Sequence, residues 1–72
     1  MKTTRIRAGE YTFTNDHGFS GEILKQPEGG WSVYDPNAYQ GRGDTLDFFM
    51  TKAEAVGFAS GINADGNARS RV

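Results

Sequence analysis

The sequence predicts an α+β domain: an antiparallel sheet of three to four strands, arranged as a meander, is packed by one short helix near the C-terminus. Two observations favour the sheet, namely apolar residues that alternate with polar ones and the short turn clusters between these segments. The third is one segment with both a start and a stop signal for a helix. A chain of 72 residues has the length of one domain. We assign residues 1–63 to it and expect residues 64–72, which lack periodicity, to be a disordered tail.

The first half of the predicted sheet is a hairpin preceded by a weaker segment. Residues 1–7 are rich in threonine and include one isoleucine, which predicts an edge strand or a frayed arm. Residues 10–14 alternate Tyr11 and Phe13 with polar residues, which is typical of a half-buried strand. Residues 15–18, Asn-Asp-His-Gly, form a turn cluster because these residue types tolerate turn conformations.

The returning strand of this hairpin is predicted over residues 19–26. Ile23 and Leu24 are adjacent there and must point to opposite faces of the sheet. Gly21 indicates a bulge or a close approach of two backbones. Residues 27–30, Pro-Glu-Gly-Gly, are the next predicted turn.

The next strand is predicted over residues 31–35, with Trp31 and Val33 on one face and Tyr34 on the other. Trp31 is expected to be the main core residue. Residues 36–43 contain proline and two glycines, which favours a surface loop over a helix or a central strand. The chain is then expected to return as a strand over residues 46–50, in which Phe48 and Phe49 point opposite ways.

The helix is predicted from Lys52 to about Ser60. Thr51 and Glu54 form a capping box, in which each side chain accepts a hydrogen bond from a backbone N–H group of the first turn. Gly61 can adopt the left-handed conformation that ends a helix in a Schellman motif, with Ile62 folding back onto Val56. The face expected to meet the sheet carries Ala55, Phe58, Ala59 and Ile62, with Val56 at its margin.

One helix of about 14 Å can cover only one face of such a sheet. Apolar side chains nevertheless point both ways along the strands. The face that the helix leaves uncovered is therefore either covered by the N-terminal segment and the long loop or available as an interface. We expect it to pair with a second copy of the chain, as a homodimer, or with a partner. It should carry one residue from each of the pairs Ile23/Leu24, Val33/Tyr34 and Phe48/Phe49.

Composition favours a cytoplasmic protein. The chain has no cysteine, which argues against a disulfide framework and a thiolate metal site. A signal peptide requires an apolar run after its basic N-terminus, and this sequence has none there. No stretch is long and apolar enough for a membrane span.

Charge is unevenly distributed, although the formal net charge is only −1. Residues 8–65 contain three basic and all nine acidic residues, a balance of −6. This acidic middle either serves only solubility or meets a basic partner, since charge complementarity raises association rate and specificity. The remaining basic residues lie at the two ends: Lys2, Arg5, Arg7, Arg69 and Arg71.

Catalysis is not expected. His17 is the only histidine, and its neighbours are ordinary turn formers, so we interpret it as an exposed turn residue. The serines have no second histidine to activate them, and the glycine pairs match no phosphate-binding or dinucleotide-binding spacing. Asp35, Asp44 and Asp47 flank the long loop without the ligand spacing of a calcium-binding EF-hand. We predict neither a metal nor another cofactor.

Aromatic residues and arginine dominate the hot spots of protein interfaces, and several gather around the long loop. Acidic residues nearby would steer a basic partner. The predicted partner-binding residues are Tyr34, Tyr39, Arg42, Asp44 and Asp47, with Glu22 and Glu28 as steering charges.

The segment GWSVYD, a loop, and then LDFFMTKAEAVGFA resembles the three-strand-plus-helix DNA-binding folds of plant ethylene-response-factor domains and phage-integrase arm-binding domains. Helices of those families often open with a Thr-x-x-Glu-Ala pattern like that of residues 51–55. The resemblance implies a sheet that enters the major groove. Those families line the sheet with arginine and lysine, however, whereas these strands carry chiefly Lys25 and several acids. Direct binding of nucleic acid by the sheet is therefore not expected.

In size, absence of cysteine, aromatic strands and acidic middle, the chain also resembles small accessory proteins of bacteriophages, including anti-CRISPR proteins and host-polymerase inhibitors. This resemblance implies a non-catalytic protein-binding module that inhibits a nucleic-acid-handling host protein in the cytoplasm. The alternative is a small nucleic-acid-binding domain whose basic arms carry Lys2, Arg5, Arg7, Arg69 and Arg71.

Overall fold

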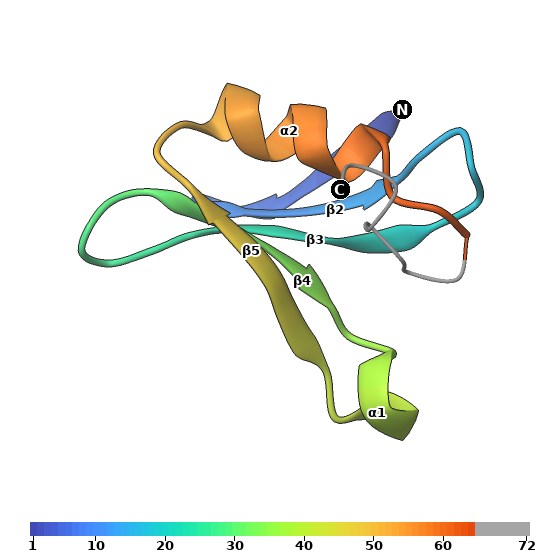
Figure 1. Cartoon of the computed structure of the whole chain (residues 1–72). Helices are drawn as coiled ribbons and strands as arrows, with labels where there is room; N and C mark the ends of the chain where they lie inside the picture. Colours follow the sequence, from blue (N-terminus) through green and yellow to red (C-terminus); the bar gives the residue numbers. More distant parts are fainter. Residues whose placement is uncertain (65–72) are drawn as a thin grey trace.

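The computed structural model describes residues 1–64. They form, in order, β1 (Lys2–Arg7), β2 (Glu10–Thr14), β3 (Ser20–Lys25), β4 (Trp31–Asp35), α1 (Ala38–Gly41), β5 (Asp44–Phe49) and α2 (Lys52–Ser60). The strands make one antiparallel sheet in the order β1-β2-β3-β4-β5. Helix α2 lies on one face of this sheet, and the β4–β5 hairpin carries α1 at its far end (Figure 1). The predicted tail falls, apart from Ala64, on residues outside the described part of the chain.

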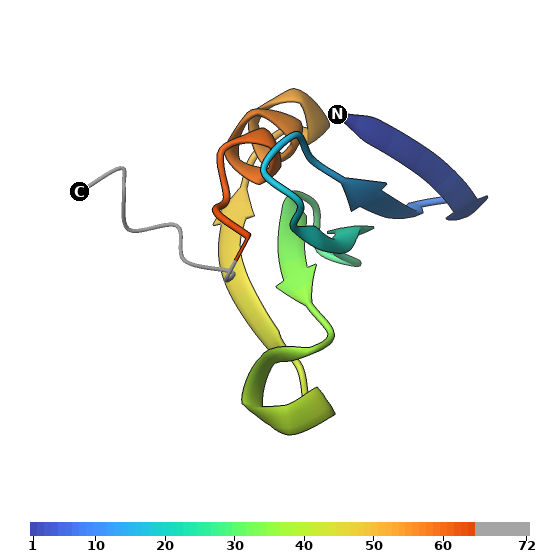
Figure 2. The ribbon, with the colours of Figure 1, turned by 90° about the vertical axis from the view of Figure 1, so that its right-hand side faces the viewer.

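The predicted meander with one C-terminal helix is confirmed, but the expected count of three to four strands is wrong, because five are present. The additional strand is β1, an edge strand paired with β2 from Lys2 opposite Thr14 to Arg7 opposite Glu10. Its six residues are all exposed, so backbone hydrogen bonds rather than burial hold it in place. The alternative of a frayed arm is therefore wrong. Figure 2 shows β1 at one edge of the curled sheet, away from β5.

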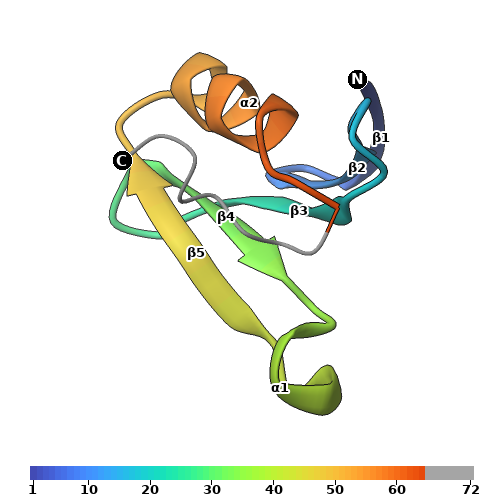
Figure 3. The same ribbon diagram turned by 45° about the vertical axis from the view of Figure 1, so that its right-hand side comes forward.

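Strand β5 begins at Asp44, two residues earlier than predicted, and ends at Phe49. The ladder with β4 extends to the pair Asp35–Asp44, next to the loop. A register shift leaves Leu46 as the extra residue of a bulge, because Val33 pairs with Asp47 and Tyr34 with Thr45. Figure 3 shows the β4–β5 hairpin extending beyond the part of the sheet that α2 covers.

The core lies between α2 and the face of the sheet that carries Ile23 and Val33. Both side chains are fully buried, whereas Trp31 is only partly buried at the margin of the core, 6.2 Å from Tyr11 between ring centroids. Trp31 is thus not the centre of the core, because it is the first residue of β4 and lies at the margin of the covered face. The close approach predicted at Gly21 is confirmed: a Cβ atom there would lie 2.8 Å from the carbonyl oxygen of Tyr34.

Helix α2 begins and ends as predicted, at Lys52 and Ser60. The capping box is present: Thr51 Oγ1 accepts from the backbone N–H of Glu54 at 3.2 Å, and Glu54 Oε1 accepts from the N–H of Thr51 at 3.1 Å. The predicted buried face is confirmed for Ala55, Ala59 and Ile62, which are fully buried, while Phe58 and Val56 pack against the core from its border.

The left-handed stop predicted at Gly61 is wrong. Gly61 has φ −101° and ψ 0°, so no Schellman motif forms. Two carbonyl groups at this end of the chain instead receive hydrogen bonds from a side chain 44 and 47 residues earlier: Asn15 Nδ2 donates to Ala59 and to Ile62, each at 2.8 Å.

Asn15 also organises the β2–β3 turn. Its Oδ1 accepts from the backbone N–H groups of His17 and Phe19, each at 3.0 Å. The side chain, only 5% exposed, thereby uses both of its donors and both lone pairs of its oxygen. Asn15 therefore ties the β2–β3 turn to the end of α2, a role that the turn-forming preference of asparagine did not predict.

The loop over residues 36–43 is a surface loop, as predicted, but its tip forms one turn, α1. Tyr39 and Gln40 have left-handed backbone angles, with φ 52° and 60°. Such angles cost a residue with a side chain about 1–2 kcal/mol each, because the Cβ atom crowds the following carbonyl. The tip is therefore a strained turn rather than a right-handed helix.

We expect Asn15→Ala to lower the free energy of unfolding by about 2–4 kcal/mol, because it leaves buried backbone groups of the turn and of α2 without partners. Asn15→Asp keeps the shape but loses both N–H donors and sets a carboxylate against two carbonyl oxygens, so it should be no less destabilising. Urea unfolding measures both. Asn37→Ala, at an exposed position with no side-chain cap bond, is the control and should stay within about 0.5 kcal/mol of wild type. A similarly small loss for Asn15→Ala would contradict the assigned role.

Candidate functional site

The face of the sheet opposite α2, here called the open face, is the candidate site. Because Trp31 and Val33 face α2, the alternate residues Ser32 and Tyr34 of β4 face the other way. The register then aligns two rows across the sheet. These rows are Leu24, Ser32 and Phe48, and Thr12, Glu22 and Tyr34.

This alignment resolves which apolar side chains the helix leaves uncovered. Ile23, Val33 and Phe49 pack on the α2 side, where the rings of Phe49 and Phe58 lie 5.1 Å apart. The apolar strip on the open face is therefore made of Leu24, Tyr34 and Phe48.

Phe48 is the most exposed member of this strip. Its side chain is 64% exposed, whereas Leu24 and Tyr34 are half-buried. Ser32, which lies between Leu24 and Phe48, is only 2% exposed. Gln26 accounts for part of the burial of Ser32, because its Nε2 donates a hydrogen bond to Ser32 Oγ at 2.7 Å.

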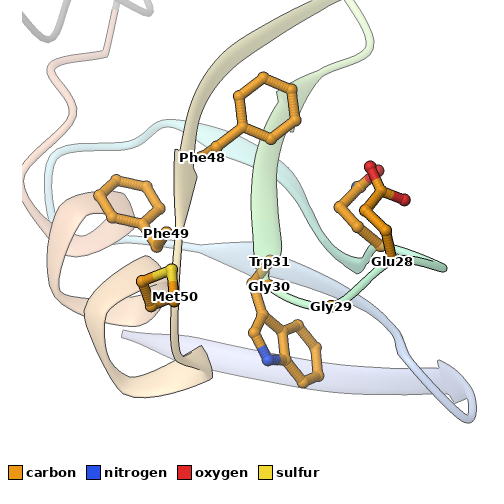
Figure 4. Close-up of a pocket in the computed structure, with 8 residues that line it drawn as sticks. Glu28, Gly29, Gly30, Trp31, Phe48, Phe49 and Met50 are labelled. Atoms are coloured by element: carbon orange, nitrogen blue, oxygen red, sulfur yellow. The ribbon is translucent and has the colours of Figure 1, made fainter.

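A cleft of about 230 Å³ borders Phe48 at the end of the sheet. Figure 4 shows the β3–β4 turn on one side of it and the end of β5 on the other. Met50, 83% exposed, stands at its border. The residues that line it are Gln26, Glu28, Gly29, Gly30, Trp31, Phe48, Phe49 and Met50.

Two lysines lie over aromatic rings on the covered side of the sheet, whereas Glu22 lies on the open face. Lys25 Nζ lies 5.6 Å from the centroid of the Trp31 ring, and Lys52 Nζ lies 3.7 Å from that of Tyr11. Both cations therefore contact aromatic rings on the α2 side of the sheet. Glu22, half-buried on the open face, has no ion-pair partner within residues 1–64.

The tip of the β4–β5 hairpin presents a second group of polar and aromatic side chains. Tyr39 is 69% exposed, and Arg42, three residues later, is also exposed. The hydroxyl of Tyr34 donates to the carbonyl oxygen of Arg42 at 3.4 Å. Tyr34 thus connects the tip to the open face.

The predicted partner-binding residues do not form one surface. Glu22 and Tyr34 lie on the open face, and Glu28 borders the cleft. The others lie at the tip or its base, except Asp47, which pairs with Val33 of the covered face. The set at the tip is Tyr39, Arg42 and Asp44.

The basic residues predicted for the alternative function are separated. The register places Lys2 and Arg7 on the open-face side of β1 and Arg5 on the α2 side. Arg7 Nε is also 2.7 Å from Glu10 Oε1, so its charge is paired. Arg69 and Arg71 lie outside the described residues. Strand β1 therefore presents no single basic surface.

His17 is exposed in the β2–β3 turn, where it was predicted. Within residues 1–64 no group of three or more histidine, cysteine, aspartate or glutamate side chains is placed to hold a metal ion. The same part of the chain contains no helix long and apolar enough to cross a membrane.

The predicted partner-binding set omitted Phe48 and Gln26. The adjacent phenylalanines in β5 already indicated that one ring would stay uncovered, but only the register shows that it is Phe48. No sequence signal indicated that Gln26 would bond Ser32, because that contact depends on how the β3–β4 turn closes.

No protein-family model matches this sequence, and neither a curated protein nor a solved structure shows significant similarity to it.

The strained tip generates a stability prediction. Gln40→Gly should raise the free energy of unfolding by about 0.5–1 kcal/mol, because glycine adopts φ 60° without a Cβ clash. Asn37→Gly, in the same loop but at φ −97°, is the matched control and should lower stability, because there glycine only adds freedom to the unfolded chain. Urea titrations compare the two. A loss of stability in both variants would show that residue 40 is not strained in solution.

Proposed function

We propose that this chain is a non-catalytic protein-binding module whose open face engages a basic surface of a partner protein. The observation that carries the proposal is the apolar strip of Leu24, Tyr34 and Phe48 on the face that α2 leaves uncovered, beside Glu22, which has no ion-pair partner within residues 1–64. An inhibitor of the bacteriophage type, which occupies the basic channel of a nucleic-acid-handling protein, would use such a surface.

Burial of the strip supports affinity. Apolar surface removed from water contributes about 25 cal/mol per Å², and aromatic residues are typical hot spots of interfaces. Phe48 has the most area to lose, because it is the most exposed member of the strip. The half-buried positions of Leu24 and Tyr34 give it a preformed apolar surround.

Glu22 determines the charge of the partner. A carboxylate that loses water without gaining a counter-charge is costly, so a partner that covers the strip must supply a basic group. This requirement disfavours a homodimer in which the strip of one copy covers the strip of the other, because the second strip would offer a further Glu22 and no basic side chain. It favours a foreign protein with lysine or arginine beside apolar side chains.

We expect Phe48→Ala to weaken partner binding at least tenfold, which corresponds to the roughly 1.4 kcal/mol or more typical of a hot-spot residue. To measure this binding, the chain is immobilised and titrated with lysate of the cell in which the protein acts. The captured protein is then quantified at two salt concentrations. Ile6→Ala removes an exposed apolar side chain from β1 instead and should leave capture unchanged. Glu22→Gln should reduce the salt dependence of capture. The proposal is contradicted if Phe48→Ala and Ile6→Ala reduce capture equally. It is also contradicted if no foreign partner is captured and the mass of the chain in solution doubles as its concentration rises.

The alternative function is binding of nucleic acid through the basic ends of the chain. It would require tight binding of DNA, which we do not expect. Because β1 divides Lys2, Arg5 and Arg7 between two sides of the sheet, we expect duplex DNA to bind no more tightly than about 10⁻⁵ M at physiological salt, within the non-specific range. Gel shifts with the full chain measure it. Sub-micromolar binding that is lost when all three residues are changed to glutamine would favour the nucleic-acid function.

A further inference from the structure

The cleft beside Phe48 is small and lies next to the apolar strip of the open face. Its volume of about 230 Å³ is below the range of roughly 300–1,000 Å³ that is usual for pockets that enclose a whole small molecule. It is suited instead to one side chain of a protein that lies on the open face.

Two side chains at its border, those of Glu28 and Gln26, offer hydrogen-bond acceptors. Glu28 contributes a carboxylate that has no ion-pair partner within residues 1–64. Gln26 is oriented by its bond to Ser32, which uses Nε2 as the donor. Its Oε1 is thereby left as an acceptor. A guest that donates hydrogen bonds and carries positive charge satisfies both groups.

Phe48 supplies an aromatic wall to the same cleft. The face of an aromatic ring is the negative end of its quadrupole and attracts a cation. In Figure 4 the Phe48 ring and the Glu28 carboxylate lie on the same side of the labelled glycines, whereas the Trp31 ring extends the other way. The register agrees, because Phe48 pairs with Ser32 of the open face and Trp31 faces α2.

The two glycines between Glu28 and Trp31 keep the floor of the cleft free of side chains. Gly29 and Gly30 have φ 102° and 87°, angles that side chains disfavour. A Cβ atom at Gly30 would also lie 2.9 Å from the carbonyl oxygen of Phe49. The tight turn that brings β3 back to β4 therefore also leaves room for a guest.

We propose that this cleft receives one arginine side chain of the protein that the open face binds. The inference rests on the proposed function and specifies the chemistry of the partner. A guanidinium group is planar and has five N–H donors, so it can stack on Phe48 while it donates to Glu28 and Gln26. The chain's own Lys25 and Lys52 form no ion pair with Glu28 and lie on the α2 side, over Trp31 and Tyr11.

The test is a titration of the ¹⁵N-labelled full chain with N-acetyl-arginine amide, followed by NMR. We expect shifts centred on the amide signals of Gly29, Gly30 and Phe48 and on the side-chain amide of Gln26, with a Kd of about 1–10 mM, as befits roughly 3–4 kcal/mol of binding. The citrulline analogue, which has nearly the same shape without the charge, should cause no such shifts. The lysine analogue should bind at least threefold more weakly.

Two variants locate the effect. Glu28→Gln should raise the Kd of the arginine probe at least fivefold without unfolding the chain, since Glu28 is exposed. Asp44→Asn, which removes an acid at the base of the hairpin tip, is the matched control and should leave the Kd unchanged. Equal binding of the arginine and citrulline analogues, equal binding of the arginine and lysine analogues, or an unchanged Kd for Glu28→Gln would each overturn the inference.

The same variants separate this inference from the proposed function. If Phe48→Ala abolishes capture of a partner while Glu28→Gln does not weaken it, the open face binds a protein but the cleft does not receive its arginine. If Glu28→Gln weakens capture in proportion to its effect on the arginine probe, the inference is supported. If the probe binds the cleft but no partner depends on Phe48, the proposed function fails.

Discussion

The hydrogen bonds of Asn15 are the constraint on which the rest of the structure depends. A single buried side chain donates to the carbonyl groups of Ala59 and Ile62 and accepts from the two backbone N–H groups that close the β2–β3 turn. It thereby holds the end of α2 over the sheet, with Ile62 fully buried beneath. In a domain this small, where little apolar area is available, one polar residue with all its hydrogen bonds satisfied can decide where α2 lies.

The position of α2 in turn decides which side of the sheet is free. The helix packs across β3, β4 and β5, so Ile23 and Val33 become the core while Leu24, Tyr34 and Phe48 stay on the open face. Two glycines allow neighbouring groups to approach the backbone closely, because glycine has no side chain. A Cβ atom at Gly21 would lie 2.8 Å from the backbone carbonyl oxygen of Tyr34, and a Cβ atom at Gly43 would overlap the Tyr34 hydroxyl. The candidate site is therefore a consequence of how the core is closed rather than a separate addition to it.

Electrostatics separates the two faces in the same way. Lys25 and Lys52, two of the three basic residues between positions 8 and 65, lie over Trp31 and Tyr11 on the α2 side. Lys25 therefore faces away from the open side. The open face carries Glu22 among apolar side chains and Glu28 borders its cleft, while Lys2 and the Glu10-paired Arg7 lie at the β1 edge of that face. That combination supports a basic protein partner over nucleic acid.

Local chemistry by itself determined the strands at residues 10–14 and 31–35, the capping box at Thr51 and Glu54, and the extent of α2, because alternation and capping act over a few neighbouring residues. It also indicated that one residue of each adjacent apolar pair would stay uncovered. Only the tertiary structure decided which one, since a strand's two faces are equivalent until a helix covers one of them. It alone placed β1 in the sheet, replaced the expected stop at Gly61 by Asn15, and joined Gln26, Glu28 and Phe48 in one cleft. Those features depend on contacts between residues far apart in the chain, which no local pattern records.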